Sequence, residues 1–294
     1  DHLALDWLWD WDHHLNYAHI KWSIDQMEGI LQRWGSHSAL IGLEPVNEPN
    51  YWTDQTFLKA YYREVRKMMK QYAPQAYFVF HNSFRSDWSD WEDLFAPGDR
   101  HLTAVDHHGY FAWSNFQNVN DACGFIEGSS DFAKDFRDNG IEVWWGEWAL
   151  ATDNCAMWLG GFNDQNPQPE ASCKPIPCPL SYLPADEFDT SFDRESTTPL
   201  GPFAQNKDSA IVGITNGTCW DDSELWTNEM VQQLGDCTLK AFNDKIDAQF
   251  LWTARNEIED KWSYINAWDK GWIKQEKADE SRSDYVNKEI KFIQ

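Results

Sequence analysis

The stretch "GLEPVNEPN", residues 42–50, decides how the fold of this chain is interpreted. It ends a short apolar run over 38–46 that is typical of a strand. Asn47-Glu48-Pro49 follows, and a proline at this point turns the backbone away from the strand direction. An amide and a carboxylate therefore stand side by side at the carboxyl end of a predicted strand. This raises the question of whether a second carboxylate lies near them.

The same alternation of strand and helix continues outward from this stretch. Further strands are predicted over 75–84, 101–111, 141–150 and 247–255. Helices are predicted over 20–35, 55–74, 87–98, 121–140 (as one helix or two), 223–246 and 261–273. The polar tail, 274–294, is a further helix candidate, and residues 1–19 form an aromatic loop. Strands that alternate with helices predict a parallel sheet with crossover helices.

The predicted fold class is α/β, a (β/α)8 TIM barrel of which about the last five strand–helix units are present. The interesting polar residues all follow strands, and in such a barrel the carboxyl ends of the strands form the catalytic face. About three strands would precede Asp1. An open, doubly wound sheet is the alternative. We expect one domain over 1–294, with an ordered, disulfide-rich insertion over 152–222.

Composition excludes several classes of partner. With 48 acidic and 24 basic residues, the net charge is −24, so nucleic acid is an unfavourable partner. No apolar run reaches membrane-spanning length, and no histidine or cysteine cluster has zinc spacing. We therefore expect no membrane segment, no metal and no cofactor. The 19 Trp residues suit either core packing or stacking on sugar rings.

Six cysteines point to an oxidising compartment. Five of them fall in the C-terminal half, which favours disulfides, but spacing alone does not determine their pairing. Asn216-Gly217-Thr218 is an N-glycosylation sequon. Because the chain begins at Asp1 and not at Met, we interpret it as a mature or incomplete chain of a secreted protein, located outside the cell or in a cell wall.

The second carboxylate is Glu147, in "VWWGEWAL", where another predicted strand ends. Two carboxyl groups in one pocket can cleave a glycosidic bond, one as the acid and the other as the nucleophile. For each residue alone an ordinary structural explanation is equally good. Asn47-Glu48-Pro49 could be a simple turn, and Glu147 could be a buried, hydrogen-bonded group among tryptophans.

Four motifs together resemble glycoside hydrolase family 5, and specifically its exo-β-1,3-glucanase branch. They are "NEP" at 47–49, "VDHHGYF" at 105–111, "GEWALATDNCAMWLGG" at 146–161 and "LWTARNEIEDKWSY" at 251–264. The resemblance covers roughly residues 25–275, and the order and spacing of four motifs make it specific.

The resemblance implies a role for each matching residue. Glu48 would be the general acid/base and Glu147 the nucleophile. The expected substrate-binding residues are Asn47 at the sugar 2-hydroxyl, His108 and Tyr110 beside the carboxylates, Trp252 under the sugar, and Phe84 and Trp113 on the leaving-group side. For His107 a structural role is the expectation. A disulfide between Cys155 and Cys219 is also implied by the family.

Two departures from the family pattern stand out. The family's usual Trp-x-Trp-Lys after the last strand is replaced here by Trp252-Thr253-Ala254-Arg255. If the second Trp of that motif is the ring that stacks under the sugar, this chain has lost it. The insertion has no counterpart in the family, and we expect it on the catalytic face.

The functional hypothesis is a retaining β-glycosidase that hydrolyses or transglycosylates β-glucan, above all β-1,3-glucan, with a polysaccharide or oligosaccharide as its partner. The alternative is a non-catalytic glycan-binding or structural wall protein that kept the barrel. A nucleotide-binding fold is set aside, because the sequence contains no glycine-rich phosphate loop.

Overall fold

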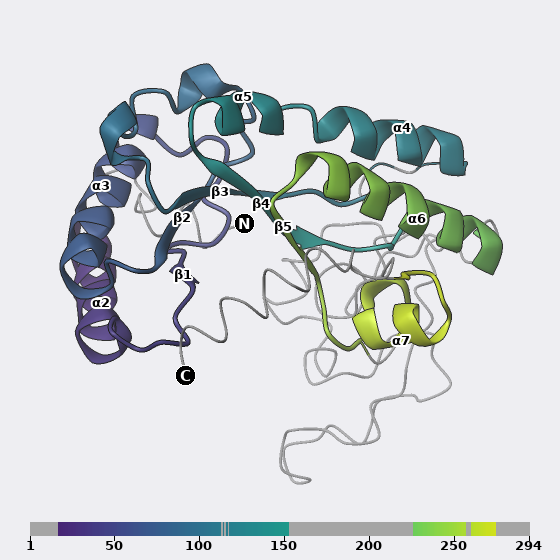
Figure 1. Ribbon diagram of the computed structural model, residues 1–294, viewed down its shortest axis with the longest axis horizontal. Helices are drawn as coiled ribbons and strands as arrows, with labels where there is room; N and C mark the ends of the chain where they lie inside the picture. Colours follow the sequence, from purple (N-terminus) through teal and green to yellow (C-terminus); the bar gives the residue numbers. More distant parts are fainter. Residues whose placement is uncertain are drawn as a thin grey trace, which may run out of the picture. The chain divides into compact units, whose positions relative to one another are not determined.

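The computed structural model describes residues 17–112, 114, 116, 118–152, 226–256 and 260–274. The chain divides into two compact units, and each is described by itself. One unit comprises 1–109, 125–148 and 240–251, and the other comprises 110–124, 149–239 and 252–294. The first unit contains the sheet (Figure 1).

The sheet has five parallel strands in the order β1-β2-β3-β4-β5. Their bounds are β1 Gly42–Leu43, β2 Tyr77–His81, β3 Thr103–His108, β4 Glu142–Trp148 and β5 Ala248–Leu251. Each strand pairs with the next one along the chain, whereas a doubly wound sheet reverses its strand order at a switch point. The predicted five units of an α/β barrel are thus confirmed, and the doubly wound alternative is wrong.

One face of the sheet is covered by helices, and its side chains form the main core. Phe78 and Phe80 of β2 pack on Tyr62, with ring centroids 6.0 and 5.9 Å away. Tyr62 belongs to α3, Gln55–Tyr72, and is fully buried. Trp145 of β4 meets Phe242 of α6, Asn228–Lys245, at 4.9 Å. The opposite face carries polar residues such as Asp106 and His108 together with aromatic ones, since Tyr77 of β2 and Trp144 of β4 pack there with ring centroids 5.3 Å apart.

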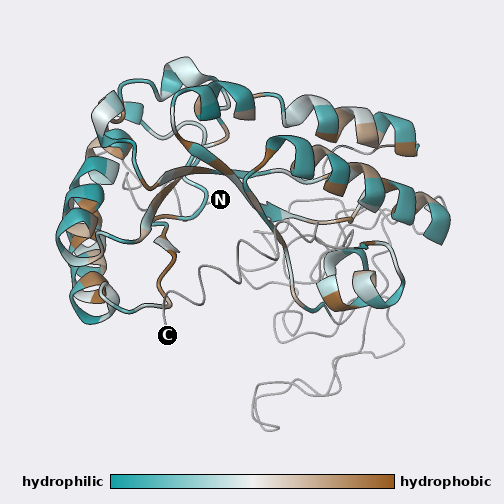
Figure 2. Cartoon of the chain, in the orientation of Figure 1, coloured by the Kyte–Doolittle hydropathy of each residue, from teal (hydrophilic) through white to brown (hydrophobic). Residues whose placement is uncertain are grey.

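Helix α3 shows why these segments become helices. Asp54 caps it by accepting hydrogen bonds from the backbone N–H groups of Thr56 and Phe57. Its buried residues recur at helical spacing on one face: Leu58, Tyr61, Tyr62, Val65, Met68 and Met69. Helix α2, Tyr17–Trp34, packs alongside it, and Figure 2 shows both helices as mixed ribbons of hydrophilic and hydrophobic residues.

Prolines and turns shorten several predicted elements. The strand predicted over 38–46 is reduced to β1, because Pro45 follows closely. The helix predicted over 87–98 is replaced by two 3-10 turns, η1 Trp88–Asp90 and η2 Pro97–Asp99. The segment 121–140 contains two helices, α4 Val119–Ser129 and α5 Ala133–Asp138. Gly140 then ends this segment with φ of +79°, a value that favours glycine.

The second unit has a small aromatic core around Trp262, with the turn η5, Asp260–Trp262, and α7, Tyr264–Asp269. A disulfide joins Cys123 of α4 to Cys237 of α6. Residues 153–225 lie outside the described residues, and with them the predicted Cys155–Cys219 disulfide and the Asn216 sequon. The single domain and the bounds of the insertion therefore stay predictions.

Candidate active site

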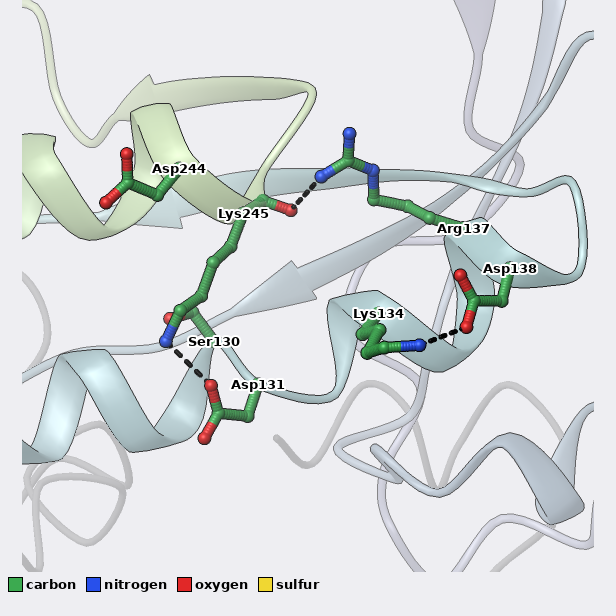
Figure 3. A pocket seen from close by; sticks show the side chains of 7 residues that line it. All are labelled: Ser130, Asp131, Lys134, Arg137, Asp138, Asp244 and Lys245. Carbon is green, nitrogen blue, oxygen red and sulfur yellow. Dashed lines mark hydrogen bonds and ion pairs between the residues drawn. The ribbon is translucent and has the colours of Figure 1, made fainter.

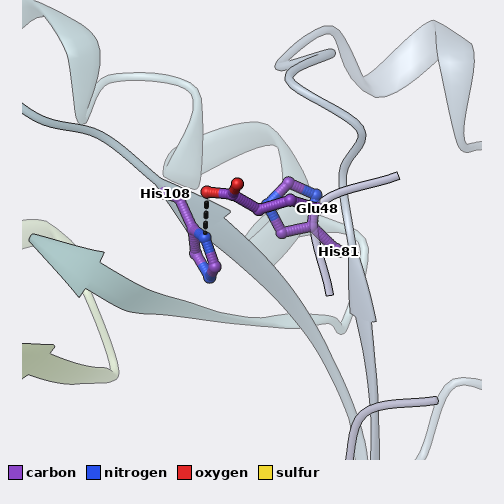
Figure 4. Close-up of side chains that lie close together, drawn as sticks. All are labelled: Glu48, His81 and His108. Carbon is purple, nitrogen blue, oxygen red and sulfur yellow. Dashed lines mark hydrogen bonds and ion pairs between the residues drawn. The ribbon is translucent and has the colours of Figure 1, made fainter. Parts of the chain in front are cut away.

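The carboxyl ends of the strands in the first unit bring Glu48, Glu147 and His108 together. His108 Nδ1 lies 2.7 Å from Glu48 Oε1 and 3.5 Å from Glu147 Oε2. Glu48 follows β1, His108 ends β3 and Glu147 lies on β4. Figure 4 shows the Glu48 carboxylate and the His108 ring facing each other, with His81 of β2 beside them. One imidazole therefore contacts both carboxylates singled out in the sequence.

A register shift in β4 aims Glu147 toward this site. His107 pairs with Trp145, but His108 pairs with Glu147, so Gly146 is skipped in the ladder. Without this irregularity, strict alternation would point Glu147 to the opposite face from Trp144. Bulges of this kind re-aim side chains and are common beside active sites.

The backbone that carries Glu48 is unusual. Glu48 has φ of +44°, and Ser83 and Phe84 at the end of β2 have φ of +53° and +58°. Non-glycine residues in this region are strained, and such strain clusters at functional sites. The Ser83 hydroxyl lies 2.9 Å from Pro49 O and 2.8 Å from Asn50 O, and thereby ties the two strained loops to each other.

A second layer of acidic groups lies beneath these residues. Asp106 of β3 is buried and accepts a hydrogen bond from Gly146 N–H at 2.7 Å, and its other oxygen lies 3.1 Å from His108 Nε2. Glu44 follows β1. Burial, followed by the charge of Asp106 and a side-chain hydrogen bond with it, raises the pKa of Glu44 well above its usual value.

The histidines of the site have opposite protonation states. Burial by itself would lower the pKa of His108, but the hydrogen bonds to Asp106 and Glu48 outweigh it and raise this pKa to about 10. Burial and the nearby charge of His108 lower the pKa of His81 well below its usual value. His81 Nδ1 accepts the Ser83 N–H, so the proton of its neutral ring is on Nε2.

These protonation states also bear on metal binding. Single ligand atoms of Glu48, His81 and His108 lie within 4.8 Å of one another, a spacing that could surround a cation. However, a metal needs a free imidazole lone pair. His108 contacts carboxylates through both ring nitrogens, and His81 uses its lone pair for Ser83. As arranged, the trio is an acid–base group and does not fit a resident metal.

The structure places the other predicted residues as follows. Asn47 is exposed next to Glu48, and Phe84 is exposed, with its ring centroid 5.1 Å from that of His81. Tyr110 and Trp252 belong to the second unit, where each packs on the buried Trp262 at 5.4 Å. Trp113 lies outside the described residues. The roles assigned to all of them stay predictions.

His107 lies on the opposite face of β3 from His108. Its ring packs between Phe132 and Trp145, at 4.9 and 4.6 Å, and its Nδ1 lies 2.8 Å from Asn82 Nδ2. Burial, followed by the charge of His108, lowers its pKa to about 4. These contacts are those of a half-buried, neutral histidine packed between aromatic rings.

Sequence reasoning missed Glu44, Asp106 and Gly146. The signal that could have found Asp106 is the two-residue period of a strand, because it stands two residues before His108 and therefore on the same face. Glu44 has no such signal, since β1 ends at Leu43 and Pro45 follows. Gly146 has no such signal, because its role depends on the close approach of β3.

A separate surface pocket lies at the amino-terminal ends of β4 and β5 (Figure 3). Two ion pairs lie within its lining, Lys134 with Asp138 and Lys245 with Asp131 at 2.6 Å, while Arg137 and Asp244 pair with residues outside it. Because these pairs satisfy one another and face away from the strand ends that carry Glu48 and Glu147, the pocket is not part of this site. Its lining residues are Ser130, Asp131, Lys134, Arg137, Asp138, Asp244 and Lys245.

Two solved structures share the fold of the chain. The crystal structure of AoRut matches with a TM-score of 0.53 and 15% identity, over 88% of this chain and 58% of that chain. The crystal structure of rutinosidase from Aspergillus niger matches with a TM-score of 0.51 and 17% identity, over 88% and 59%. Among the described residues, none of the helices has the length and apolar character needed to cross a membrane.

Two comparisons of sequence agree with the fold. The curated protein "Probable glucan 1,3-beta-glucosidase A" of Neosartorya fischeri is 25% identical over 145 residues, which are 48% of this chain and 34% of that protein. The chain thus spans about a third of the relative that it matches. Residues 2–166, more than half of the chain, match the model of the cellulase family. Together with the barrel strands and the paired carboxylates, this match shows that the chain belongs to glycosyl hydrolase family 5.

Proposed function

We propose that this chain belongs to a secreted, retaining β-glycosidase that acts on β-glucan, with β-1,3-glucan as the preferred substrate. The observation that carries the proposal is the contact of one nitrogen, His108 Nδ1, with both Glu48 and Glu147. The family and the name of the curated relative support the substrate class. The Cys123–Cys237 disulfide supports a location outside the cell.

The distances favour retention over inversion. Because His108 Nδ1 lies 2.7 Å from Glu48 Oε1 and 3.5 Å from Glu147 Oε2, these two oxygens are at most 6.2 Å apart. Retaining enzymes keep their carboxyl groups roughly 5–5.5 Å apart, whereas inverting enzymes need about 6.5–9.5 Å to admit a water molecule. The spacing therefore supports direct attack by one carboxylate.

In the proposed mechanism the Glu147 carboxylate attacks the anomeric carbon while the Glu48 carboxyl group donates its proton to the leaving oxygen. This forms an ester between Glu147 and the sugar. Glu48, now a carboxylate, then removes a proton from water, which attacks the same carbon and releases Glu147. A sugar hydroxyl in place of water would give transglycosylation. Asn47 would bind the 2-hydroxyl, where hydrogen bonds strengthen in the transition state.

Two variants of the full chain test the roles on an activated aryl β-glucoside. Glu147→Gln should abolish turnover, because no nucleophile remains. Glu48→Ala should slow hydrolysis by about 10²–10⁴-fold, and azide should partly restore the rate as a glycosyl azide forms, because a good leaving group needs no proton. Glu92→Gln, which removes an exposed carboxylate, is the matched control and should keep the wild-type rate.

Several outcomes would contradict the proposal. Substantial turnover by Glu147→Gln would exclude it as the nucleophile, and absence of azide rescue would count against Glu48 as the acid/base. A wild-type chain that binds β-1,3-glucan oligosaccharides without cleaving them would support the non-catalytic alternative. Cleavage of β-1,4-glucan or mannan oligosaccharides in preference would overturn the substrate assignment alone.

A further inference from the structure

A carboxyl pair beneath the site, the half-buried Glu44 and the buried Asp106, has no place in the mechanism described so far. Besides burial, the charge of Asp106 and a side-chain hydrogen bond with it raise the pKa of Glu44. Two ionised carboxylates offer no donor, so a hydrogen bond between them requires that one carries a proton. Two carboxyl groups in contact also repel each other when both are charged, and this favours sharing a single proton.

The contacts of the two groups decide which one carries the proton. Asp106 accepts the backbone N–H of Gly146 on one oxygen and faces His108 Nε2 with the other. Two donors, one of them on a cationic ring, stabilise its ionised form. The Glu44 Oε1 atom is buried and has no hydrogen-bond partner among the described residues. A neutral acid tolerates this position far better than a carboxylate does.

We propose, building on the function proposed above, that Glu44 and Asp106 share one proton and form a positioning pair beneath the catalytic carboxylates. The pair keeps His108 doubly protonated, so that its Nδ1–H can follow the negative charge as it passes from Glu147 to Glu48. His108 touches neither the bond that breaks nor the bond that forms in this scheme; it acts through the two carboxylates.

The geometry explains why a permanent cation is useful here. The negative charge starts on Glu147, and after the first step it is on Glu48. Nδ1 lies within 3.5 Å of both carboxylates, so a small reorientation moves the charge-assisted hydrogen bond from one to the other. A neutral His108 whose proton is on Nε2 would have no proton on Nδ1 to offer. The ionised Asp106 prevents this by stabilising the imidazolium.

The surrounding titratable groups leave this charge distribution undisturbed. Tyr62 of α3 stays neutral, because burial, followed by the charge of Glu44, raises its pKa well above the usual value. His81 of β2 faces His108, at a ring distance of 4.5 Å, and is neutral because burial lowers its pKa. His107 is neutral on the outer face of β3. In the described part of the chain, Glu48 and Glu147 are the carboxylates that face His108 Nδ1.

The test is an NMR titration of His108 in the resting full chain, with its imidazole carbon and nitrogen signals followed from pH 5 to 11. In the wild-type protein the midpoint should lie near pH 10. Asp106→Asn should lower it by about two units or more, because the supporting charge is gone. Glu44→Gln should leave it within about half a unit, since glutamine is a neutral donor of the same shape. Glu142→Gln, on β4 but bonded to Tyr77, is the control and should have no effect.

Infrared spectroscopy at pH 7 gives a second readout that does not depend on how Asp106→Asn folds. A carbonyl stretch of a protonated carboxylic acid should be lost in Glu44→Gln and retained in Glu48→Gln, a variant that removes the proton of the acid/base and so separates the two bands. A wild-type His108 midpoint near 6.5 would overturn the proposal. It would also be overturned if Glu44→Gln lowered the midpoint as much as Asp106→Asn does, or left the infrared band unchanged. None of these measurements requires turnover, so their failure is distinguishable from failure of the proposed function.

Discussion

At the scale of single residues, Gly146 shows how tightly this site is assembled. A Cβ atom at this position would collide with both carboxylate oxygens of Asp106. The same glycine donates its N–H to Asp106 and is the residue that the β4 register skips. Glycine is thus needed here for close approach of two strands and not for an unusual φ angle.

Gly146→Ala should therefore destabilise the protein and displace Asp106. The added methyl group meets a side chain fixed by two hydrogen bonds, so we expect a loss of about 1–3 kcal/mol in the free energy of unfolding. Urea denaturation measures it. Gly128→Ala, in α4 with open space around the new methyl group, is the matched control and should be neutral or stabilising by up to about 1 kcal/mol. Equal effects of the two substitutions would contradict the close approach.

Protonation of His107 should account for part of the loss of folding stability at acidic pH. Its pKa is lowered to about 4 in the folded protein, below the ordinary value of 6.5. The unfolded chain therefore binds the proton first, and the stability that the neutral ring contributes is lost as pH falls from 6.5 toward 4. In His107→Gln, the dependence of unfolding free energy on pH in this window should decrease by up to about 1.4 kcal/mol per pH unit. An unchanged slope would mean that His107 titrates normally.

At the scale of elements, the strands and the helices have different tasks. The strands bring side chains of distant sequence to one edge, while α3, α5 and α6 cover the outer face with aromatic and aliphatic side chains. The tie between α4 and α6 is covalent, because the disulfide Cys123–Cys237 closes a loop across 114 residues of sequence. Loops of this length gain the most from a cross-link, since the unfolded chain loses most freedom.

Reduction of this disulfide should lower the stability of the protein by about 2–5 kcal/mol. Thermal unfolding with and without a reductant measures the change in Tm. The double variant Cys123→Ala/Cys237→Ala provides the comparison: it should unfold at the lower temperature of the reduced protein. Cysteines 155, 173, 178 and 219 stay in both proteins, so a further decrease on reduction of the double variant would be due to them. An equal Tm for wild type and double variant would contradict the stabilising role.

At the scale of the whole molecule, charge is the dominant feature. A net charge of −24 means that acidic groups repel one another more than ion pairs attract. Pairs such as Lys70–Asp99 and Lys21–Asp25 are exposed and contribute little each. Salt, which screens the repulsion between these charges, should therefore stabilise the folded protein.

Raising sodium chloride from 10 to 150 mM should increase Tm by a few degrees at pH 7. The Debye length falls from about 30 to about 8 Å over this range, which weakens long-range repulsion more than close contacts. Potassium chloride should act in the same way, because the effect depends on ionic strength and not on the identity of the ion. A decrease in Tm with salt would show that the ion pairs outweigh the repulsion.

The sequence by itself determined the order of the elements, the parallel sheet and the two carboxylates at strand ends. These features follow from local signals: the alternation of apolar periods, the prolines and glycines that end elements, and the motifs after each strand. Prediction from the sequence was least accurate for short elements, namely β1 and the two 3-10 turns. Prolines and local turns override the apolar pattern there.

Only the tertiary structure decided which polar residues act together. The β4 irregularity that turns Glu147 toward His108 joins residues 39 apart in sequence, and the contact of Glu44 with Asp106 joins residues 62 apart. Protonation depends on burial and on neighbouring charges, which a sequence does not specify. For this reason three successive residues, Asp106, His107 and His108, are an anionic partner, a neutral core group and a cation within one strand.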